Sequence, residues 1–264
     1  KLPARGVIRL RLGERYNKSS IFHLQFRSVR VGSEDLELTD VTRWLFRLSP
    51  YDILLLLKGA LTTIALSVGA IGMGSILGAV VGWIRSLRLV KRIRPLWWLT
   101  SIYVDTMRGT PLLLQVYFVY YAVPVLTGIN TSVFFAGIAT LALFQGGYVS
   151  EAVRSGLEAI ERTQWWAGES LGMSYLQTMR YIILPQAIKI IIPPFIGICL
   201  GVIKDTSLVS TIGFIELSFR AKSIGARTLD TLPPWLFAAG LYFIICYPIS
   251  RYSQRIEARL RKKQ

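Results

Sequence analysis

Eight polar side chains interrupt the long apolar stretches of this chain, and their types suggest a binding site rather than a catalytic one. Cationic, anionic and hydrogen-bonding groups all occur in the set, which comprises Arg108, Thr110, Gln115, Gln145, Glu151, Asp205, Thr206 and Ser207. A charged residue inside a membrane span is costly and is by default a hypothesis about function. Because the sequence shows no pairing of a nucleophile with a general base, we expect these groups to bind a small solute without reacting with it.

The first of these residues break an apolar run. In the stretch Arg108-Gly109-Thr110-Pro111, Thr110 can act as a helix cap and Pro111 can occupy the first position of a new helix. The prediction is a half-helix N-terminus inside the membrane, whose free N–H groups suit a carboxylate and to which Arg108 adds positive charge. The alternative is a kink from which Arg108 reaches the lipid headgroups. Gln115, one turn further on, is expected to line the same cavity.

The other polar residues allow two interpretations. Glu151 either pairs with Arg154 or Arg108 as a structural bridge, or Glu151 or Asp205 holds a substrate ammonium group. The two hydroxyl residues that follow Asp205 can hydrogen-bond the same solute. Gln145 precedes a Gly-Gly pair, whose simplest role is close helix packing.

Composition places the chain in a membrane. Hydrophobic residues make up 52% of the 264 residues, charged residues only 17%, and the mean hydropathy is +0.46. A helix needs about 20 apolar residues to cross the hydrocarbon core, and five runs approach or exceed that length. Because backbone groups in lipid must pair internally, we expect an all-α protein, with the fourth run broken at Pro193 and Pro194. The runs are Ile53–Ile84, Leu96–Leu126, Thr131–Val149, Ala187–Ile203 and Trp235–Tyr252.

The net charge of +16 is unevenly distributed along the chain. The loop of residues 85–94 is basic and has no acid, and the stretch after the last run contains only one acid, Glu257, against Arg251, Arg255, Arg259, Arg261, Lys262 and Lys263. The positive-inside rule therefore predicts a multi-pass membrane protein with this loop, residues 164–185 and the C-terminus in the cytoplasm. Glu216 falls in an expected outer re-entrant segment and is predicted to face water. No nucleic-acid partner is expected, because the basic residues do not gather on one surface.

Residues 1–50 form an N-terminal segment that contains no run of spanning length. We expect this segment to be extramembrane or interfacial and the transmembrane domain to occupy residues 51–264. Trp44, Leu45, Phe46 and Leu48 fit an amphipathic lead-in at the membrane interface. The segment is net basic although the topology puts it outside, which further spans upstream of residue 1 would explain.

Cysteine and histidine give no sign of a metal or cofactor. Cys199 and Cys246 both lie in apolar runs, and His23 is the only histidine, so no disulfide, metal site or cofactor is expected. The sequence contains no GxxxxGK[ST] phosphate loop. If a nucleotide drives this protein, a partner must supply the energy.

A polar, Trp-rich segment separates the third and fourth apolar runs. Between Gln164 and Pro185 the sequence predicts two short helices with a break at Gly172, which can adopt the left-handed conformation that ends a helix. Ser174 then fits an N-cap, with Gln177 at the capping-box spacing. Pro185 is expected to close the second helix or to kink the span that follows. We interpret the segment as a docking surface.

The spacing within this segment resembles the EAA loop of ABC importer permeases. Trp166-Ala167-Gly168 is followed after three residues by Gly172 and after nine more by Ile182-Ile183-Leu184-Pro185. In that family the loop forms the coupling helix, which seats in a cleft of the ATPase subunit. Here the coupling loop would span about residues 163–185.

Three further stretches are similar to the polar amino acid permeases in particular, and they occur in family order from about residue 53 to the C-terminus. They are Asp105–Leu112, Glu151–Arg154 and Lys204–Leu208. The resemblance implies a five-helix type I importer permease that is a transport subunit and not an enzyme. It also implies ABC ATPase subunits, a second permease subunit and an amino-acid-binding protein as partners, with transport by alternating access.

Two positions of the motif depart from the family pattern. The family usually has Glu where this chain has Trp166, and Gly168 replaces the second Ala. Trp offers apolar area and an indole N–H in place of a charge, so we expect Trp165 and Trp166 to fill an apolar cleft on the ATPase, with Ala167, Gly168 and Gly172 completing the docking site. The alternative is that the tryptophans anchor at the membrane interface. The departure also favours a heterodimer with a sister permease that keeps the acidic motif.

Two other functions remain open at this point. One is an ABC importer for a different small solute, because the loop does not specify cargo. The other is an ion-coupled secondary transporter that uses Asp205 and Glu151 as proton or sodium sites; the spacing of the coupling loop argues against it.

Overall fold

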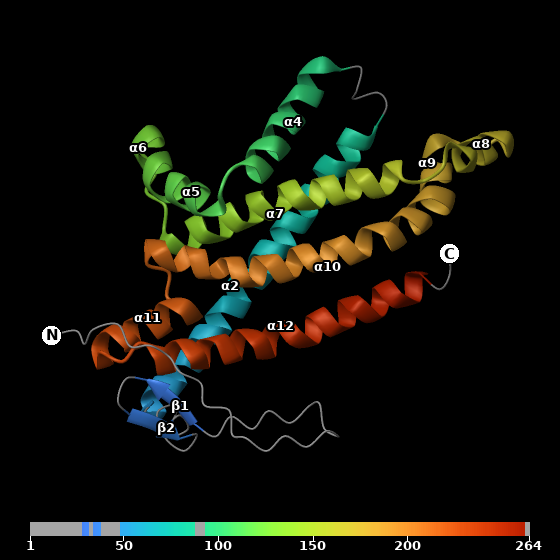
Figure 1. The fold of residues 1–264 in the computed structure, drawn as a ribbon. Helices are drawn as coiled ribbons and strands as arrows, with labels where there is room; N and C mark the ends of the chain where they lie inside the picture. The colour runs from blue at the N-terminus through green and yellow to red at the C-terminus, as the bar shows by residue number, and fades with distance from the viewer. Residues whose placement is uncertain (1–27, 32–33, 38–47, 88–92, 262–264) are drawn as a thin grey trace, which may run out of the picture.

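The computed structural model describes residues 28–31, 34–37, 48–87 and 93–261, which form a bundle of helices with a small hairpin (Figure 1). The hairpin pairs β1 (Ser28–Val31) with β2 (Glu34–Glu37) in antiparallel fashion, within the N-terminal segment for which the sequence predicted no strand. The long helices are α2 (Pro50–Ser86), α4 (Arg94–Gly109), α7 (Val133–Glu158), α10 (Leu184–Val209) and α12 (Leu232–Arg261). The shorter helices are α5 (Leu112–Tyr117), α6 (Val123–Thr127), α8 (Arg162–Ser170), α9 (Tyr175–Thr178) and α11 (Leu217–Thr228).

The helices confirm the all-α membrane class. Four stretches are long and apolar enough to cross a membrane, namely α2, α7, Tyr175–Ile212 and α12. Helix α4 and the stretch Leu112–Thr127 pass the same test only together, and they are bent against each other by 112°. Each predicted run falls in one of these elements, and the predicted count of five is reached when the bent pair is taken as one span.

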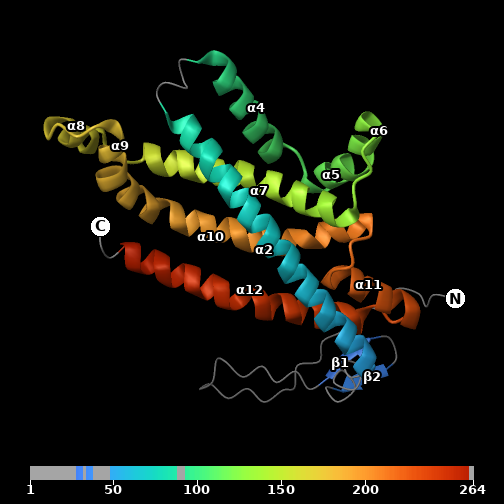
Figure 2. The ribbon, with the colours of Figure 1, turned by 180° about the vertical axis from the view of Figure 1, so that it is seen from behind.

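Helix α2 crosses α7 diagonally, and glycine makes this crossing possible (Figures 1 and 2). A Cβ atom at Gly78 would lie 2.6 Å from the Cβ of Val149, and one at Gly82 would lie 2.4 Å from the carbonyl oxygen of Ser150. These distances are too short for any side chain, so the two backbones touch directly. Close contact of this kind is how helices associate in lipid, where the hydrophobic effect does not drive helices together.

Pro193 and Pro194 do not break α10, which contradicts the sequence prediction. The helix runs without interruption from Leu184 to Val209. Each proline removes one hydrogen bond to the carbonyl group four residues earlier. The surrounding hydrocarbon offers the other backbone groups no alternative partner, so the helix persists on both sides of the pair.

Proline acts differently where it follows a π-helical turn. Such turns occupy Phe118–Ala122 and Met179–Ile183, and each is followed by a helix whose second residue is proline. The residue just before that proline donates to the carbonyl group five positions earlier. Before Pro185 the helical turn therefore contains one extra residue, and the helix then continues. As a result, α9 does not end there as an independent helix but leads directly into α10.

Several predictions concerned the first fifty residues. Trp44, Leu45, Phe46 and His23 lie outside the described residues. Leu48 packs against a cluster formed by α2, α11 and α12, so it contacts protein.

Cys199 and Cys246 are both free thiols.

Glu216 is fully buried, which contradicts the prediction that it faces water. Its carboxylate caps α11 by accepting from the backbone N–H of Phe219 at 2.8 Å, and it accepts from the Thr63 hydroxyl at 3.1 Å and the Tyr242 hydroxyl at 2.8 Å. These donors come from α11, α2 and α12. The sequence prediction failed because it treated Glu216 as a loop residue, whereas hydrogen bonds from three helices replace the water that it would otherwise need.

Replacing Glu216 by leucine should therefore destabilise the protein more than replacing it by glutamine. Leucine leaves three buried donors without an acceptor, at about 1–3 kcal/mol for each donor that cannot turn elsewhere. Glutamine keeps one acceptor oxygen, and the two hydroxyl groups can rotate. The thermal unfolding midpoint in detergent measures the difference, with the exposed Glu169→Leu as control. Equal midpoints for the two Glu216 variants would contradict this assignment.

Candidate functional site

The break between α4 and α5 lies at the residues that the sequence indicated, but its capping differs. Helix α4 ends at Gly109 with Thr110 as its C-cap, and Pro111 is the N-cap of α5. The prediction that Thr110 caps the new helix was therefore wrong. The Thr110 hydroxyl donates back to the carbonyl of Thr106 at 2.8 Å, so it serves the helix that ends rather than the one that begins.

Gln115 holds this break together. Its side-chain amide donates to the carbonyl of Met107 at 3.0 Å, and to the carbonyl and hydroxyl of Thr110 at 3.2 and 2.8 Å. These carbonyl groups stand at the end of α4, where no further helical N–H is available. Gln115 is buried and acts as a clip across the 112° bend.

A cavity of about 230 Å³ lies between α7 and α10. Gln145 and Asp205 face it from opposite helices, and the list of lining residues is completed by Phe144, Tyr148, Ile198, Gly201 and Val202. Arg108 lies over the ring of Tyr148, 5.6 Å from its centroid. The volume is below the ~300–1,000 Å³ of pockets for drug-sized ligands. Asp205 thus lines a space that suits a small solute, and the cationic Arg108 lies against one of its other lining residues.

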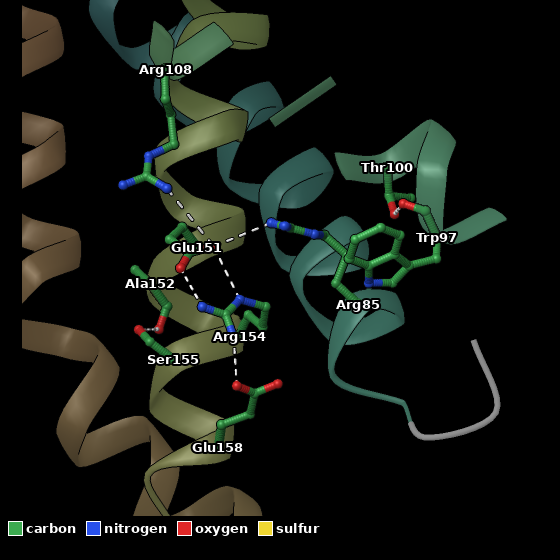
Figure 3. A network of polar contacts seen from close by, with 9 residues as sticks. All are labelled: Arg85, Trp97, Thr100, Arg108, Glu151, Ala152, Arg154, Ser155 and Glu158. Atoms are coloured by element: carbon green, nitrogen blue, oxygen red, sulfur yellow. Dashed lines mark hydrogen bonds and ion pairs between the residues drawn. The ribbon is translucent and has the colours of Figure 1, made fainter. Parts of the chain in front are cut away.

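Glu151 lies among three guanidinium groups, as Figure 3 shows. Its carboxylate accepts from Nη1 of Arg85 at 3.2 Å and from Nε of Arg154 at 3.0 Å, and Arg154 makes a second bond through Nη2. Nη1 of Arg108 is 3.9 Å away, close enough for an ion pair but not for a hydrogen bond. Arg154 also pairs with Glu158. The predicted structural bridges of Glu151 with Arg154 and Arg108 are both present.

Arg85 is the member of this cluster that sequence reasoning missed. It was assigned to a basic cytoplasmic loop, yet it lies in the last turn of α2 with only 10% of its side chain exposed. The glycines at one-turn spacing on α2 were the available signal, because they bring α2 against α7 close to Glu151. Nothing local to Arg85 distinguishes it from its basic neighbours.

The hydroxyl residues after Asp205 do not line the cavity. Thr206 is fully buried and donates to the carbonyl of Ile203 at 2.7 Å, and Ser207 donates to the carbonyl of Lys204 at 2.7 Å. Hydroxyl groups in helices commonly bond to the preceding turn in this way. Of the predicted binding residues, Gln145 and Asp205 therefore line the cavity, and Arg108 contacts Tyr148, which also lines it.

The segment between α7 and α10 has the predicted break. Gly172 has φ +68°, and the N–H of Met173 donates to the carbonyl of Gly168 at 3.0 Å, which is a Schellman ending for α8. Ser174 and Gln177 form the predicted capping box at the start of α9. The two helices therefore meet at a defined angle.

The two neighbouring tryptophans have different environments. Trp165 stacks on Tyr175, with ring centroids 5.4 Å apart, and packs against the cluster formed by the ends of α7 and α10. Trp166 is 57% exposed. Gly168 has a packing role, because a Cβ there would lie 2.6 Å from the side chain of Thr178. Of the predicted docking tryptophans, only Trp166 presents a large free surface.

Comparison with known proteins identifies the family. The model of the "binding-protein-dependent transport system inner membrane component" family matches residues 70–262. The chain belongs to this family. It is 38% identical over 186 residues to the L-cystine transport permease TcyB of Bacillus subtilis, covering 70% of this chain and 79% of that protein. It is 36% identical over 217 residues to a putative glutamine transport permease, GlnP, of Rickettsia bellii, covering 82% and 97%.

Solved structures of ABC transporters are also similar to this chain. A crystal structure of an amino acid ABC transporter with histidines matches with a TM-score of 0.72 and 29% identity, covering 85% of this chain and 99% of that one. The MetNI methionine ABC transporter in an inward-facing form matches at a TM-score of 0.66 and 18% identity, covering 81% and 99%, which shows the fold alone. The chain is therefore a multi-pass inner membrane permease of an ABC importer. An ATPase subunit and a binding protein are its partners, and the ATPase hydrolyses ATP.

The pair formed by Arg85 and Glu151 should behave as a coupled unit. Glu151→Gln leaves the buried Arg85 without its acidic partner and should destabilise the protein, toward the lower end of ~3–5 kcal/mol because Glu151 keeps 24% exposure. Arg85→Gln should cost less, because Glu151 keeps Arg154 and Arg108 as partners. The double variant should lose clearly less than the sum of the two. Thermal unfolding of the purified protein provides the measurement, and Glu169→Gln, at an exposed position outside the cluster, serves as the control. Strict additivity would show that the pair does not couple.

Proposed function

We propose that this permease imports amino acids, delivered by an extracytoplasmic binding protein, through a pathway that includes the cavity between α7 and α10. The observation that supports this most directly is the pair of opposite charges at the cavity: Asp205 lines it, and Arg108 lies over the ring of Tyr148, another lining residue. An amino acid carries a carboxylate and an ammonium group on adjacent atoms, so a small space between a cation and an anion matches it. The names of the relatives, which include cystine, glutamine and arginine permeases, point the same way.

Each polar residue then has a role in the proposed site. Arg108 binds the substrate carboxylate and Asp205 binds the ammonium group. Gln145 lines the cavity, donates through Nε2 to the Ser75 hydroxyl of α2 at 3.3 Å, and has in Oε1 a buried acceptor without a protein partner, which adds a hydrogen bond to the substrate. Thr110 and Gln115 maintain the bend that positions Arg108. Glu151 holds Arg108 near the cavity and does not bind the ammonium group, because the three surrounding guanidinium groups would repel a cation.

Thr206 and Ser207 complete the proposed site through the backbone of α10. Their hydroxyl groups bond to the turn before Asp205, so they stabilise the part of the helix that carries the carboxylate. In this proposal they support the substrate site and do not contact the substrate.

Analogues that lack one charge can separate the roles of Arg108 and Asp205. Losing a charge-assisted hydrogen bond costs about 1.5–3 kcal/mol, or roughly 10- to 100-fold in affinity. Arg108→Gln should weaken amino acid binding by this factor but leave binding of the amino acid amide unchanged. Asp205→Asn should weaken binding of the amino acid but not of its des-amino analogue. Binding to the purified complex without the binding protein is the measurement.

Lys222→Gln and Asp230→Asn on the outer α11 segment make the same charge changes away from the cavity and serve as controls. Unchanged binding in both test variants would rule out the proposed site. A loss that does not depend on which analogue is used would assign the two residues to structure alone.

The segment from α8 to α9 supports a coupling role. The exposed Trp166 fills an apolar cleft on the ATPase, Trp165 anchors α8 to α9, and Ala167, Gly168 and Gly172 shape the turn between them. Gln186 of α10 donates to Gln164 of α8 at 3.1 Å, so a movement of α8 is transmitted to a spanning helix. In this proposal α8 and the C-terminus face the cytoplasm, and ATP-driven closure of the ATPases reorients the spans.

The sister subunit in the proposed importer is a different permease. Trp166 stands where the related loops usually have an acid, so one docking site of the pair is apolar and the other is acidic. Purifying the intact complex and identifying its subunits tests the heterodimer, and amino acid stimulation of its ATPase tests the cargo. Uptake into vesicles with an ion gradient but no ATP would overturn the proposal as a whole.

Substitution of each tryptophan should have a distinct effect. Trp166→Ala should uncouple the complex, lowering substrate-stimulated ATPase activity at least tenfold with little change in the unfolding midpoint of the permease, because an exposed aromatic anchor is lost. Trp165→Ala should lower that midpoint, because Trp165 packs internally. Co-purification of the ATPase and thermal unfolding distinguish the two. If Trp166→Ala left both association and activity intact, the docking role would be wrong.

A further inference from the structure

Helix α12 extends well beyond the membrane at its C-terminal end. It contains 30 residues and is therefore about 45 Å long, against a hydrocarbon core of ~30 Å. Its apolar part closes near Tyr252, which is 62% exposed, and Tyr247 is 49% exposed one turn earlier. Exposed tyrosines at the end of an apolar span mark the membrane–water interface. The residues from Arg251 onward, which we call the extension, thus begin at the level of the lipid headgroups.

Three arginines occupy one face of this extension. Arg251, Arg255 and Arg259 follow one another at one-turn spacing, and all are exposed. The opposite face holds Ser253, Ile256 and Leu260, the less exposed residues of this stretch, which turn toward the protein. We refer to the three arginines as the arginine stripe.

The arginine stripe continues the exposed side of the apolar part of the same helix. Ile244, in the apolar part, is 66% exposed. With 3.6 residues per turn, Arg251 and Arg255 lie within about 20° of Ile244 around the helix axis, and Arg259 lies about 60° away. Glu257, the acid on this stretch, lies on the far side from Arg255 and Arg259. The exposed face therefore changes from apolar at Ile244 to cationic from Arg251 onward, with the exposed Tyr247 and Tyr252 on its two flanks, in the order of a leaflet from its core to its surface.

We propose that the arginine stripe binds the phosphate groups of anionic phospholipids at the end of α12. The stripe begins where the apolar part of a membrane-spanning helix ends, which is the level of the lipid headgroups, and the sign of its charge selects anionic over zwitterionic headgroups. Each arginine near an anionic leaflet contributes about 1 kcal/mol, which corresponds to roughly fivefold in affinity. Guanidinium groups bind phosphate in bidentate fashion. The lipid would fix the position of α12 relative to the leaflet.

The test uses the intact importer in nanodiscs that contain equal amounts of phosphatidylglycerol and phosphatidylcholine, with native mass spectrometry of the lipids that remain bound. Arg251→Gln with Arg255→Gln should lower the ratio of retained phosphatidylglycerol to phosphatidylcholine at least tenfold. Arg251→Lys with Arg255→Lys should retain most of the preference, because the charge is kept. Raising the salt concentration before detection should weaken the preference of the unmodified protein.

Lys58→Gln with Lys222→Gln is the matched control. It removes the same charge from exposed positions near the start of α2 and on α11, at the opposite end of the bundle (Figures 1 and 2). An unchanged lipid ratio in the arginine double variant would overturn the proposal, and so would an equal fall in the control. Loss of the ATPase subunit from the arginine variant with an unchanged lipid ratio would assign the stripe to a protein contact instead.

Discussion

The structure depends on the absence of any hydrogen-bond partner in hydrocarbon. Every interruption of a spanning helix must be satisfied by the protein itself, and the chain solves this problem in a different way at each point. At the α4–α5 bend, the Gln115 amide takes up carbonyl groups that the ended helix leaves open. Before Pro124 and Pro185, a π-helical turn pairs the preceding N–H with a carbonyl five residues back. At Pro193 and Pro194, the helix simply continues.

The same constraint explains which parts of the fold could be predicted from the sequence. Apolar length revealed the spans, and local chemistry revealed the Gly172 ending and the Ser174 capping box, because a turn or cap depends on a few adjacent residues. The break at Arg108–Pro111 was visible for the same reason. The effect of a proline within a spanning helix could not be predicted from its neighbours in the sequence. A broken helix, a π-helical turn and an uninterrupted helix all start from the same missing backbone N–H.

Long-range partners were beyond the sequence. Glu216 was predicted to face water, yet the donors that bury it come from positions 63 and 242, far away in the chain. Arg85 likewise looked like one basic residue among several in a loop. Its partner, Glu151, was recognised as important, but only the close α2–α7 crossing shows that three guanidinium groups surround it. A buried charge indicates that a partner exists without indicating where in the chain the partner lies.

Helix α7 connects the two candidate regions mechanically. Gln145 and Tyr148 face the cavity, Glu151 and Arg154 hold the charge cluster one to two turns later, and the helix ends at Glu158, just before α8. The cluster ties this stretch to the last turn of α2, and the glycines of α2 hold the two backbones in direct contact. A tightly packed pair of helices moves as a unit more readily than it deforms. Displacement of α8 would therefore reach the cavity wall as a rigid-body movement of α7 with α2.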